Sequence, residues 1–254
     1  MDENVFVAAV HLLEEAKRKQ ITIRLLGGSA IRMRCPIAHA DPVLNRNVPD
    51  IDLICRKKHS KILSQMLIEL GATPNSMFNA LHGDKRLLFS DVKNSRQIDV
   101  FLDLFEMCHT FDFSKRMELD EVTLTLADLM LTKLQIIEIN EKDYKDILCL
   151  VLDHDLSEKD EYDRINATYL AELCAADWGV WRTLTRNIQW VIDFTKTSAL
   201  EPPKRELALG RLDAMLDRIQ KEPKSLKWKM RSKVGEKMVW YDTPDRVGKI
   251  SLGQ

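Results

Sequence analysis

The amino-acid sequence predicts an α+β fold in which a small mixed sheet flanked by helices is followed by a helical C-terminal region. Up to about residue 120, amphipathic helical segments alternate with short β-rich runs. After about residue 123 the pattern turns helical. We therefore expect a sheet-containing domain over residues 1–120 and a mainly helical domain over residues 121–254.

The elements of the first half follow from periodicity and from turn-forming residues. Apolar residues at helical spacing predict helices, and alternation of polar and apolar residues predicts half-buried strands. Glycines interrupt two of these segments, at Gly27-Gly28 and at Gly71. In chain order we expect a helix over 4–19, a strand over 21–26, a short helix over 29–33 capped by Ser29, a loop over 35–49, a strand over 50–54, a helix over 60–70, a loop over 72–85 and a strand pair over 86–89 and 97–102.

The second half is expected to consist of helices. Ser157 is a candidate cap for one of them, and Pro202-Pro203 marks a break because proline cannot continue a helix. The expected helices cover residues 126–139, 144–152, roughly 160–197, and 204–221. The tail from residue 222 mixes Lys, Arg and Trp without a clear period.

Composition argues against several classes of protein. The 38 basic and 39 acidic residues leave a formal net charge of −1, so no overall charge draws the chain to nucleic acid or membrane. No apolar run reaches the ~18 residues of a membrane span. The five cysteines are widely spaced without a CxxC pair, so a zinc site or a disulfide framework is not expected. The acidic start is unlike a signal peptide, and we expect a cytoplasmic protein without membrane contact.

Three acidic residues lie on predicted strands. Asp50 and Asp52 are two residues apart, so they project from the same face of one strand, and Asp99 lies on another strand that can adjoin it. Clustered carboxylates repel one another, and a hard divalent cation removes that cost. We therefore predict that Asp50, Asp52 and Asp99 hold magnesium, with manganese as the alternative, and form the catalytic site.

The Gly27-Gly28-Ser29 step after the first strand is a candidate phosphate site. Glycines let the backbone approach a phosphate closely, and the N-terminus of the following helix offers free N–H groups. The step lacks the spacing of a Walker A loop. Alone, a Gly-Gly-Ser turn is usually only a turn, and an Asp-x-Asp strand is usually a solvated surface strand. Their combination in this order favours a functional site.

These motifs resemble the DNA polymerase β-like nucleotidyltransferase superfamily. The resemblance rests on Leu25–Ala30, Asp50–Leu53 and Ile98–Val100. It implies the nucleotidyltransferase fold and transfer of a nucleoside monophosphate from a nucleoside triphosphate (NTP) with magnesium. It also implies that Asp50 and Asp52 form the metal pair, that Asp99 completes the site, and that the glycine step binds the triphosphate.

A finer resemblance points to the AbiEii-like branch, which contains toxins of toxin–antitoxin pairs. It rests on Leu126–Gln135 and Lys142–Ile147, and it implies that Lys133 and Lys145 face the phosphates and that Asp146 belongs to the same cluster. Two features depart from the branch. Between Gly28 and Asp50 lie residues 29–49, a longer spacing than usual, and a further acid expected after Asp146 is missing.

The function expected from these observations is metal-dependent nucleotidyl transfer to an unidentified acceptor, which is RNA, a protein or a small molecule. The alternatives are a non-catalytic nucleotide- or RNA-binding module and a toxin-like protein with a protein partner. The basic tail 224–237 contains Trp228 and is a candidate RNA contact, although a solvated charged segment is the commoner explanation. Weaker candidates for substrate contact are Asn79, His82, Arg86 and Arg96.

Overall fold

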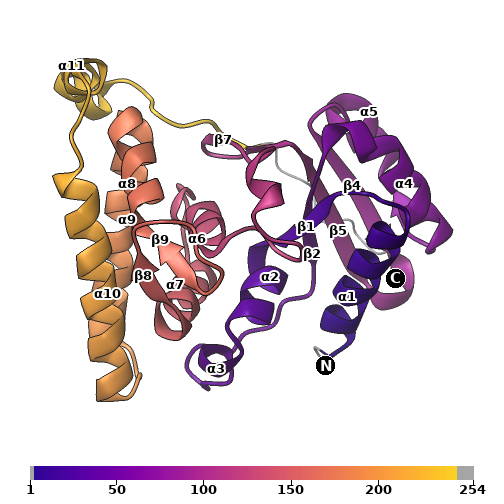
Figure 1. The fold of residues 1–254 in the computed structure, drawn as a ribbon, viewed down its shortest axis with the longest axis horizontal. Helices are drawn as coiled ribbons and strands as arrows, with labels where there is room; N and C mark the ends of the chain where they lie inside the picture. The colour runs from indigo at the N-terminus through magenta and orange to yellow at the C-terminus, as the bar shows by residue number, and fades with distance from the viewer. Residues whose placement is uncertain (1–2, 245–254) are drawn as a thin grey trace. The chain divides into compact units, whose positions relative to one another are not determined.

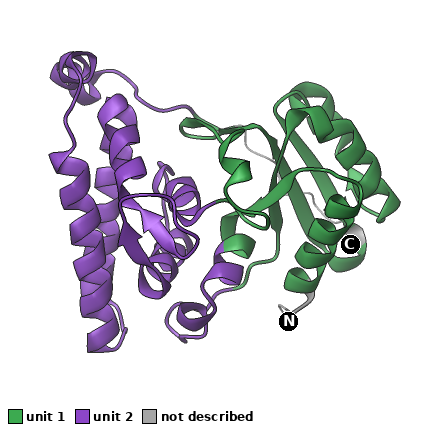
Figure 2. Cartoon of the chain, viewed as in Figure 1, with its two compact units in different colours: residues 1–30, 47–124, 243–254 green, residues 31–46, 125–242 purple. Residues whose placement is uncertain are grey.

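The computed structural model describes residues 3–244, which pack as two compact units (Figure 1, Figure 2). Of these residues, unit 1 contains 3–30, 47–124 and 243–244, and unit 2 contains 31–46 and 125–242. The segment 31–46 thus packs with the helices that follow residue 124, although it precedes most of the sheet in sequence. The single boundary near residue 120 stays a prediction.

Unit 1 is built on a mixed sheet, and this confirms the fold class expected from the sequence. Strands β2 (Ile51–Cys55) and β5 (Arg96–Leu102) are parallel, whereas the other neighbouring pairs of this sheet are antiparallel. A hairpin of β6 (Leu104–Glu106) and β7 (Thr110–Asp112) continues from β5. The main strands, in spatial order, are β1 (Ile23–Leu26), β2 (Ile51–Cys55), β5 (Arg96–Leu102), β4 (Arg86–Asp91) and β3 (Thr73–Pro74).

In unit 1, the first helix and the helix that ends before Gly71 form where the sequence predicts them. Its α-helices are α1 (Glu3–Arg18), α4 (Ser60–Glu69) and α5 (Ser76–His82), together with the start of α2 (Gly27–Arg34), which continues into unit 2. Short 3-10 helices lie at η1 (Lys57–His59), η2 (Val92–Asn94) and η3 (Arg116–Glu118).

Two expectations for unit 1 are wrong. Ser29 does not cap α2, because that helix begins at Gly27, directly after β1, and Ser29 lies inside it. The segment 72–85 is not a loop, because it forms β3 and α5. The Asn75 side chain caps α5, and the Asn79 side chain bonds both backbone groups of Leu88 in β4, at 2.7 and 3.1 Å. Such contacts with a distant strand give no periodic signal in the sequence.

Unit 2 is mainly helical, as expected. Pro202 and Pro203 begin a helix, since proline is tolerated in the first turn. Within the described residues of unit 2, the helices are α3 (Pro36–His39), α6 (Leu126–Leu134), α7 (Glu141–Asp153), α8 (Ala167–Ala176), α9 (Trp178–Thr197), α10 (Pro202–Lys221), α11 (Leu226–Val234) and the 3-10 helix η4 (Gly235–Lys237). A small parallel pair joins β8 (Asp155–Ser157) to β9 (Arg164–Asn166).

Several expected boundaries in unit 2 need correction. Ser157 lies in β8 and caps no helix, because Asn166 caps α8 instead. Helix α7 begins before residue 144, at a capping box formed by Asn140 and Asp143. The loop expected over 35–49 contains the short helix α3, and the tail beyond residue 222 contains α11.

Helix α6 ends at Leu134, earlier than expected, where a buried side chain from another helix binds its end. The Asn187 amide nitrogen on α9 donates to the carbonyls of Leu134 and Ile136, each at 2.7 Å. Asn187 is fully buried. A helix leaves its last carbonyls without partners inside the helix, so this single side chain satisfies the end of α6 and joins it to α9.

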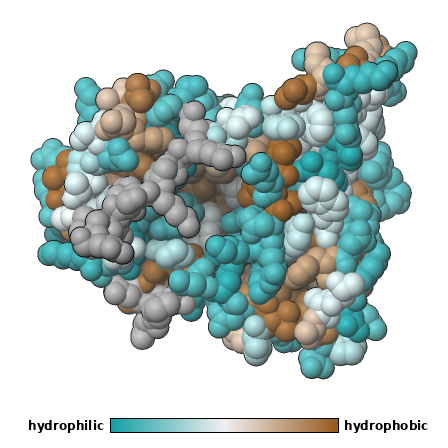
Figure 3. All heavy atoms as spheres, turned by 180° about the vertical axis from the view of Figure 1, so that it is seen from behind, coloured by the Kyte–Doolittle hydropathy of each residue, from teal (hydrophilic) through white to brown (hydrophobic). Residues whose placement is uncertain are grey.

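Hydrophilic side chains cover much of the face shown in Figure 3, with hydrophobic ones between them. Within residues 3–244, every helix is too short or too polar to cross a lipid bilayer. The five cysteines lie buried as free thiols. Burial raises the pKa of both Cys55 and Cys149 to about 12, which keeps these thiols protonated and weakly reactive at neutral pH.

Replacing Asn187 tests the end of α6. In Asn187→Leu the carbonyls of Leu134 and Ile136 lose their donor inside the protein, so we expect the free energy of unfolding to fall by about 1–3 kcal/mol, measured by urea denaturation. Gln189→Leu is the control, because Gln189 is exposed on the same helix and its amide donates to Asp193 one turn further along. An equal loss in both variants would contradict this role of Asn187.

Candidate active site

The pairing of β2 with β5 places two of the three predicted carboxylates side by side. Asp52 and Asp99 are direct partners in the parallel register, so their side chains leave the same face of the sheet. Asp52 is half-buried and Asp99 is 5% exposed. The sequence left open whether the two strands adjoin, and the structure brings Asp52 and Asp99 together.

Asp50 lies one residue before β2 and is exposed. Its Oδ1 accepts a hydrogen bond from the backbone N–H of Gln97 at 3.3 Å, which ties the start of β2 to the start of β5. Asp50 precedes Asp52 by two residues, just outside β2, and this hydrogen bond holds its carboxylate beside the start of β5. The pairing of Asp50 and Asp52 as metal ligands stays a prediction.

Asp99 has a partner that the sequence analysis did not assign. The Arg86 guanidinium donates to both oxygens of Asp99, from Nε to Oδ1 at 2.8 Å and from Nη2 to Oδ2. Arg86 also lies over the ring of Phe101, 4.7 Å from its centre. Since Leu88 opposes Asp99 in the antiparallel pair of β4 and β5, Arg86 is on the same face. The register of the expected strand pair was the signal that could have identified it.

The glycine step meets the carboxylates at the end of β1. Leu26 is the antiparallel partner of Asp52, so Gly27 follows directly beside that carboxylate. Gly27 has φ +65°, and a Cβ atom at this position would lie 1.9 Å from Oδ2 of Asp52. Gly28 is buried, and the Ser29 hydroxyl donates to the Leu26 carbonyl at 3.4 Å. Position 27 therefore requires glycine, both because its φ is positive and because a Cβ atom would clash with Asp52.

The residues present fit a magnesium ion by their chemistry, without forming a closed cage. Carboxylate oxygens are the donors that magnesium prefers, and it commonly takes only one or two of them together with phosphate oxygens and water. Both oxygens of Asp99 already accept from Arg86. Across residues 3–244, no group of three or more His, Cys, Asp or Glu side chains is arranged to hold an ion. Asp50 and Asp52 are the residues that would hold one beside a triphosphate.

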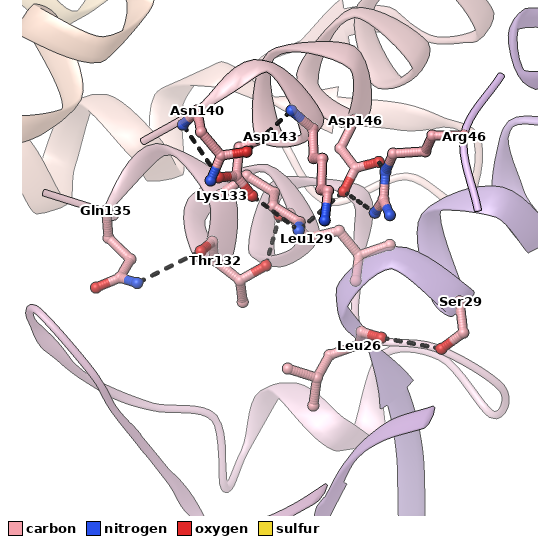
Figure 4. A network of polar contacts seen from close by, with 11 residues as sticks. Leu26, Ser29, Arg46, Leu129, Thr132, Lys133, Gln135, Asn140, Asp143 and Asp146 are labelled. Atoms are coloured by element: carbon pink, nitrogen blue, oxygen red, sulfur yellow. Dashed lines mark hydrogen bonds and ion pairs between the residues drawn. The ribbon is translucent and has the colours of Figure 1, made fainter. Parts of the chain in front are cut away.

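A second charged cluster lies within unit 2 (Figure 4). The Lys133 ammonium on α6 is 2.8 Å from Asp146 and 3.2 Å from Asp143, both on α7. The Arg46 guanidinium donates to both oxygens of Asp146, at 2.7 and 2.6 Å. Asp146 therefore forms a cluster with Lys133, and Arg46 from the long segment before β2 joins it.

The charges in this cluster stabilise one another's ionised forms. Burial alone would raise the pKa of Asp146, but the positive charges of Lys133 and Arg46 outweigh it and hold that pKa below its ordinary value. Burial alone would lower the pKa of Lys133, but Asp146 and Asp143 outweigh it and raise that pKa. Both pKa shifts favour the charged form, so Asp146 and Lys133 are charged at neutral pH.

Lys145 forms an ion pair within its own helix. The Lys145 ammonium lies 2.9 Å from Glu141, one turn earlier in α7. The predicted contacts of Lys133 and Lys145 with a triphosphate stay predictions.

In the basic tail, the Trp228 indole donates to the Cys174 carbonyl at 2.9 Å and packs edge-on against Trp181. Its ring is thus part of the packing of unit 2, which weakens the case for base stacking.

Substitution of Gly27 tests the close approach of Asp52. Gly27→Ala and Gly71→Ala both place a Cβ at a positive φ, which costs about 1–2 kcal/mol, but only Gly27→Ala also meets a carboxylate. We expect urea denaturation to show a larger loss for Gly27→Ala. In an Asp52→Ala background that extra loss should shrink, because the clashing oxygen is gone. A Gly27→Ala loss no greater than that of Gly71→Ala would contradict the packing described here.

The Asp146 cluster predicts a pH dependence of stability. A carboxyl whose pKa is lowered by folding stabilises the folded state above its unfolded pKa of about 4, and this contribution is lost as pH falls through the folded pKa. Asp146→Asn leaves the charges of Lys133 and Arg46 without this partner, so we expect a loss of about 3–5 kcal/mol at pH 7. The gap between wild type and variant should narrow below pH 4.

Urea denaturation between pH 7 and pH 3 measures this gap. Asp193→Asn is the matched control, because its ion pair with Lys196 is exposed on α9, so its effect should be small at every pH. A gap for Asp146→Asn that stays constant down to pH 3 would show that the Asp146 charge is not its source.

Comparison with known proteins finds no matching family model and no matching curated protein. Among solved structures, the chain is similar to the solution structure of the antibiotic-resistance factor ANT(2'')-Ia, with a TM-score of 0.42 and 13% sequence identity. The similarity covers 59% of this chain and 84% of that chain. A likeness of this size does not define the function of the chain, and the candidate site rests on its own geometry.

Proposed function

We propose that this chain is a magnesium-dependent nucleotidyltransferase, which moves a nucleoside monophosphate from an NTP to an acceptor and releases pyrophosphate. The observation that carries the proposal is the strand register that aligns Leu26, Asp52 and Asp99 across three neighbouring strands. It sets the carboxylates beside the glycine step, where a triphosphate would meet both. The acceptor is RNA, a protein or a small molecule.

Each part of the site has a task in this reaction. The backbone N–H groups at the start of α2, near Gly27 and Gly28, would bind phosphate oxygens, because a helix N-terminus favours negative charge. Asp50 and Asp52 would hold magnesium, which neutralises phosphate charge when bound. The acceptor hydroxyl would form a new bond to the α-phosphorus as the bond to pyrophosphate breaks. Asp99 would accept the proton of that hydroxyl, and Arg86 would orient its carboxylate.

The finer assignments belong to the same proposal. The residues of α6 and α7 that resemble the AbiEii-like branch support placing the chain there, and we propose a cytoplasmic location. The pairing of Arg46 with Asp146 supports a structural task for the long segment before β2. The alternative is a module that binds nucleotide or RNA without turnover. It would use the same metal and triphosphate site, but it would form no transfer product.

Nucleotide binding is the first test. We expect calorimetry with the four ribonucleoside triphosphates to give magnesium-dependent binding to the wild type. In Asp52→Ala the affinity should fall by at least about tenfold, since even outer partners of metal ligands are worth this much. Asp213→Ala, an exposed site on α10, is the control and should bind like the wild type.

The possible outcomes separate the alternatives. Magnesium-dependent binding that Asp52→Ala leaves unchanged would refute the metal site. Binding that needs Asp52, followed by release of pyrophosphate when an RNA pool, a protein extract or a small-molecule pool is added, would support transfer and identify the class of acceptor. Binding without pyrophosphate release in any of these mixtures would favour the non-catalytic module.

A further inference from the structure

A pocket of about 180 Å³ lies in unit 1, on the other face of the sheet from the carboxylates. Ile51 and Ile98 contribute to its wall and are partners in the β2–β5 register. Each adjoins a carboxylate in its strand, Asp52 or Asp99, and successive residues of a strand point to opposite faces. The pocket is therefore distinct from the candidate active site.

Seven of the eleven residues that line this pocket are apolar, and the four polar ones are His11, Asp91, Asn94 and Arg96. Leu12 from α1 and Leu67 from α4 line it together with the two isoleucines of the sheet. At the end near the turn between β4 and β5, it is lined by Arg96 and by Asp91. A pocket that combines apolar side chains with a few polar groups is the usual form of a site for a small molecule.

The Arg96 guanidinium is buried with unmet hydrogen-bonding capacity. Its side chain is 3% exposed, and its Nε and Nη1 atoms have no hydrogen-bond partner. Asp91 Oδ2 lies 3.9 Å from Nη1, which allows electrostatic attraction but is too far for a hydrogen bond. Asp91 instead accepts from Asn94, at 2.7 Å to Oδ2 and 3.3 Å to Oδ1. Buried donors without partners are costly, so Arg96 leaves a donor site for a bound acceptor.

We infer that this pocket binds a small organic carboxylate, which accepts hydrogen bonds from Arg96 and places its apolar body against Leu12, Leu67 and the isoleucines. Its volume is similar to that of an engineered cavity of about 150 Å³ that binds benzene in another protein, so a ring or a short chain fits. Asp91 lines the same pocket and repels a second negative charge, so a carboxylate is favoured over a phosphate dianion.

Calorimetric titration of the full chain tests this site, with acetate, butyrate and benzoate as probes and inorganic phosphate as the competing anion. We expect saturable binding of one molecule of butyrate or benzoate per chain. Arg96→Met should weaken it at least tenfold by removing the donors. Ala8→Leu should do the same by filling space, because Ala8 lines the pocket. Arg56→Met is the control outside the pocket and should bind like the wild type.

Folding of the variants is checked in the same series by urea denaturation. Arg96→Met removes a buried charge without a hydrogen-bonded partner, so we expect its stability without ligand to equal or exceed that of the wild type. If Arg96→Met does not fold, the affinity of Ala8→Leu for the carboxylates tests the inference instead. The inference is overturned if none of the carboxylates binds saturably, if phosphate binds more tightly than all of them, or if the folded pocket variants bind like the wild type. None of these outcomes bears on magnesium or nucleotide binding.

Discussion

Strand β2 hydrogen-bonds with β1 on one side and β5 on the other, and this double pairing positions the candidate active site. Leu26, Asp52 and Asp99 lie in line across the three strands. Because side chains alternate, a slip of one residue in β2 would turn Asp52 toward the apolar face that Leu12 and Leu67 cover. Burial of that face therefore fixes the register, and the register in turn fixes the carboxylates.

The charges of the site are compensated unequally. Arg86 holds Asp99 through two hydrogen bonds, so a charge that is almost wholly buried has its counterion within the protein. Asp50 is exposed and Asp52 half-buried, and water can stabilise both. The pair that water can reach is thus the pair that can exchange water for a cation, whereas Asp99 is held in a fixed orientation beside it. This difference supports distinct tasks for the carboxylates.

The sequence predicted the parts of the molecule that depend on local pattern. Apolar periodicity gave the helices α1 and α4, and the glycine step followed by Asp50 and Asp52 gave the order of motifs around the sheet. Where a side chain binds a distant backbone group, local pattern was not enough. Helix α5 depends on Asn79 bonding Leu88, and the end of α6 depends on Asn187 from α9. The pairing of Arg86 with Asp99 needed the register of two strands, which was implicit in the expected strand pair.

Three arginines show how the surroundings of a charge separate structure from candidate function. Arg46 and Arg86 each donate two hydrogen bonds to one carboxylate, and each joins two different elements of the fold. In both pairs the protein itself supplies the acceptor for the arginine. Arg96 is as deeply buried as either, yet two of its nitrogens lack acceptors. A protein interior rarely leaves a charge in this state, and a bound ligand is one partner that satisfies such a group. Arg46 and Arg86 thus have their acceptors within the protein, whereas the unmet donors of Arg96 support the inference that it binds a ligand.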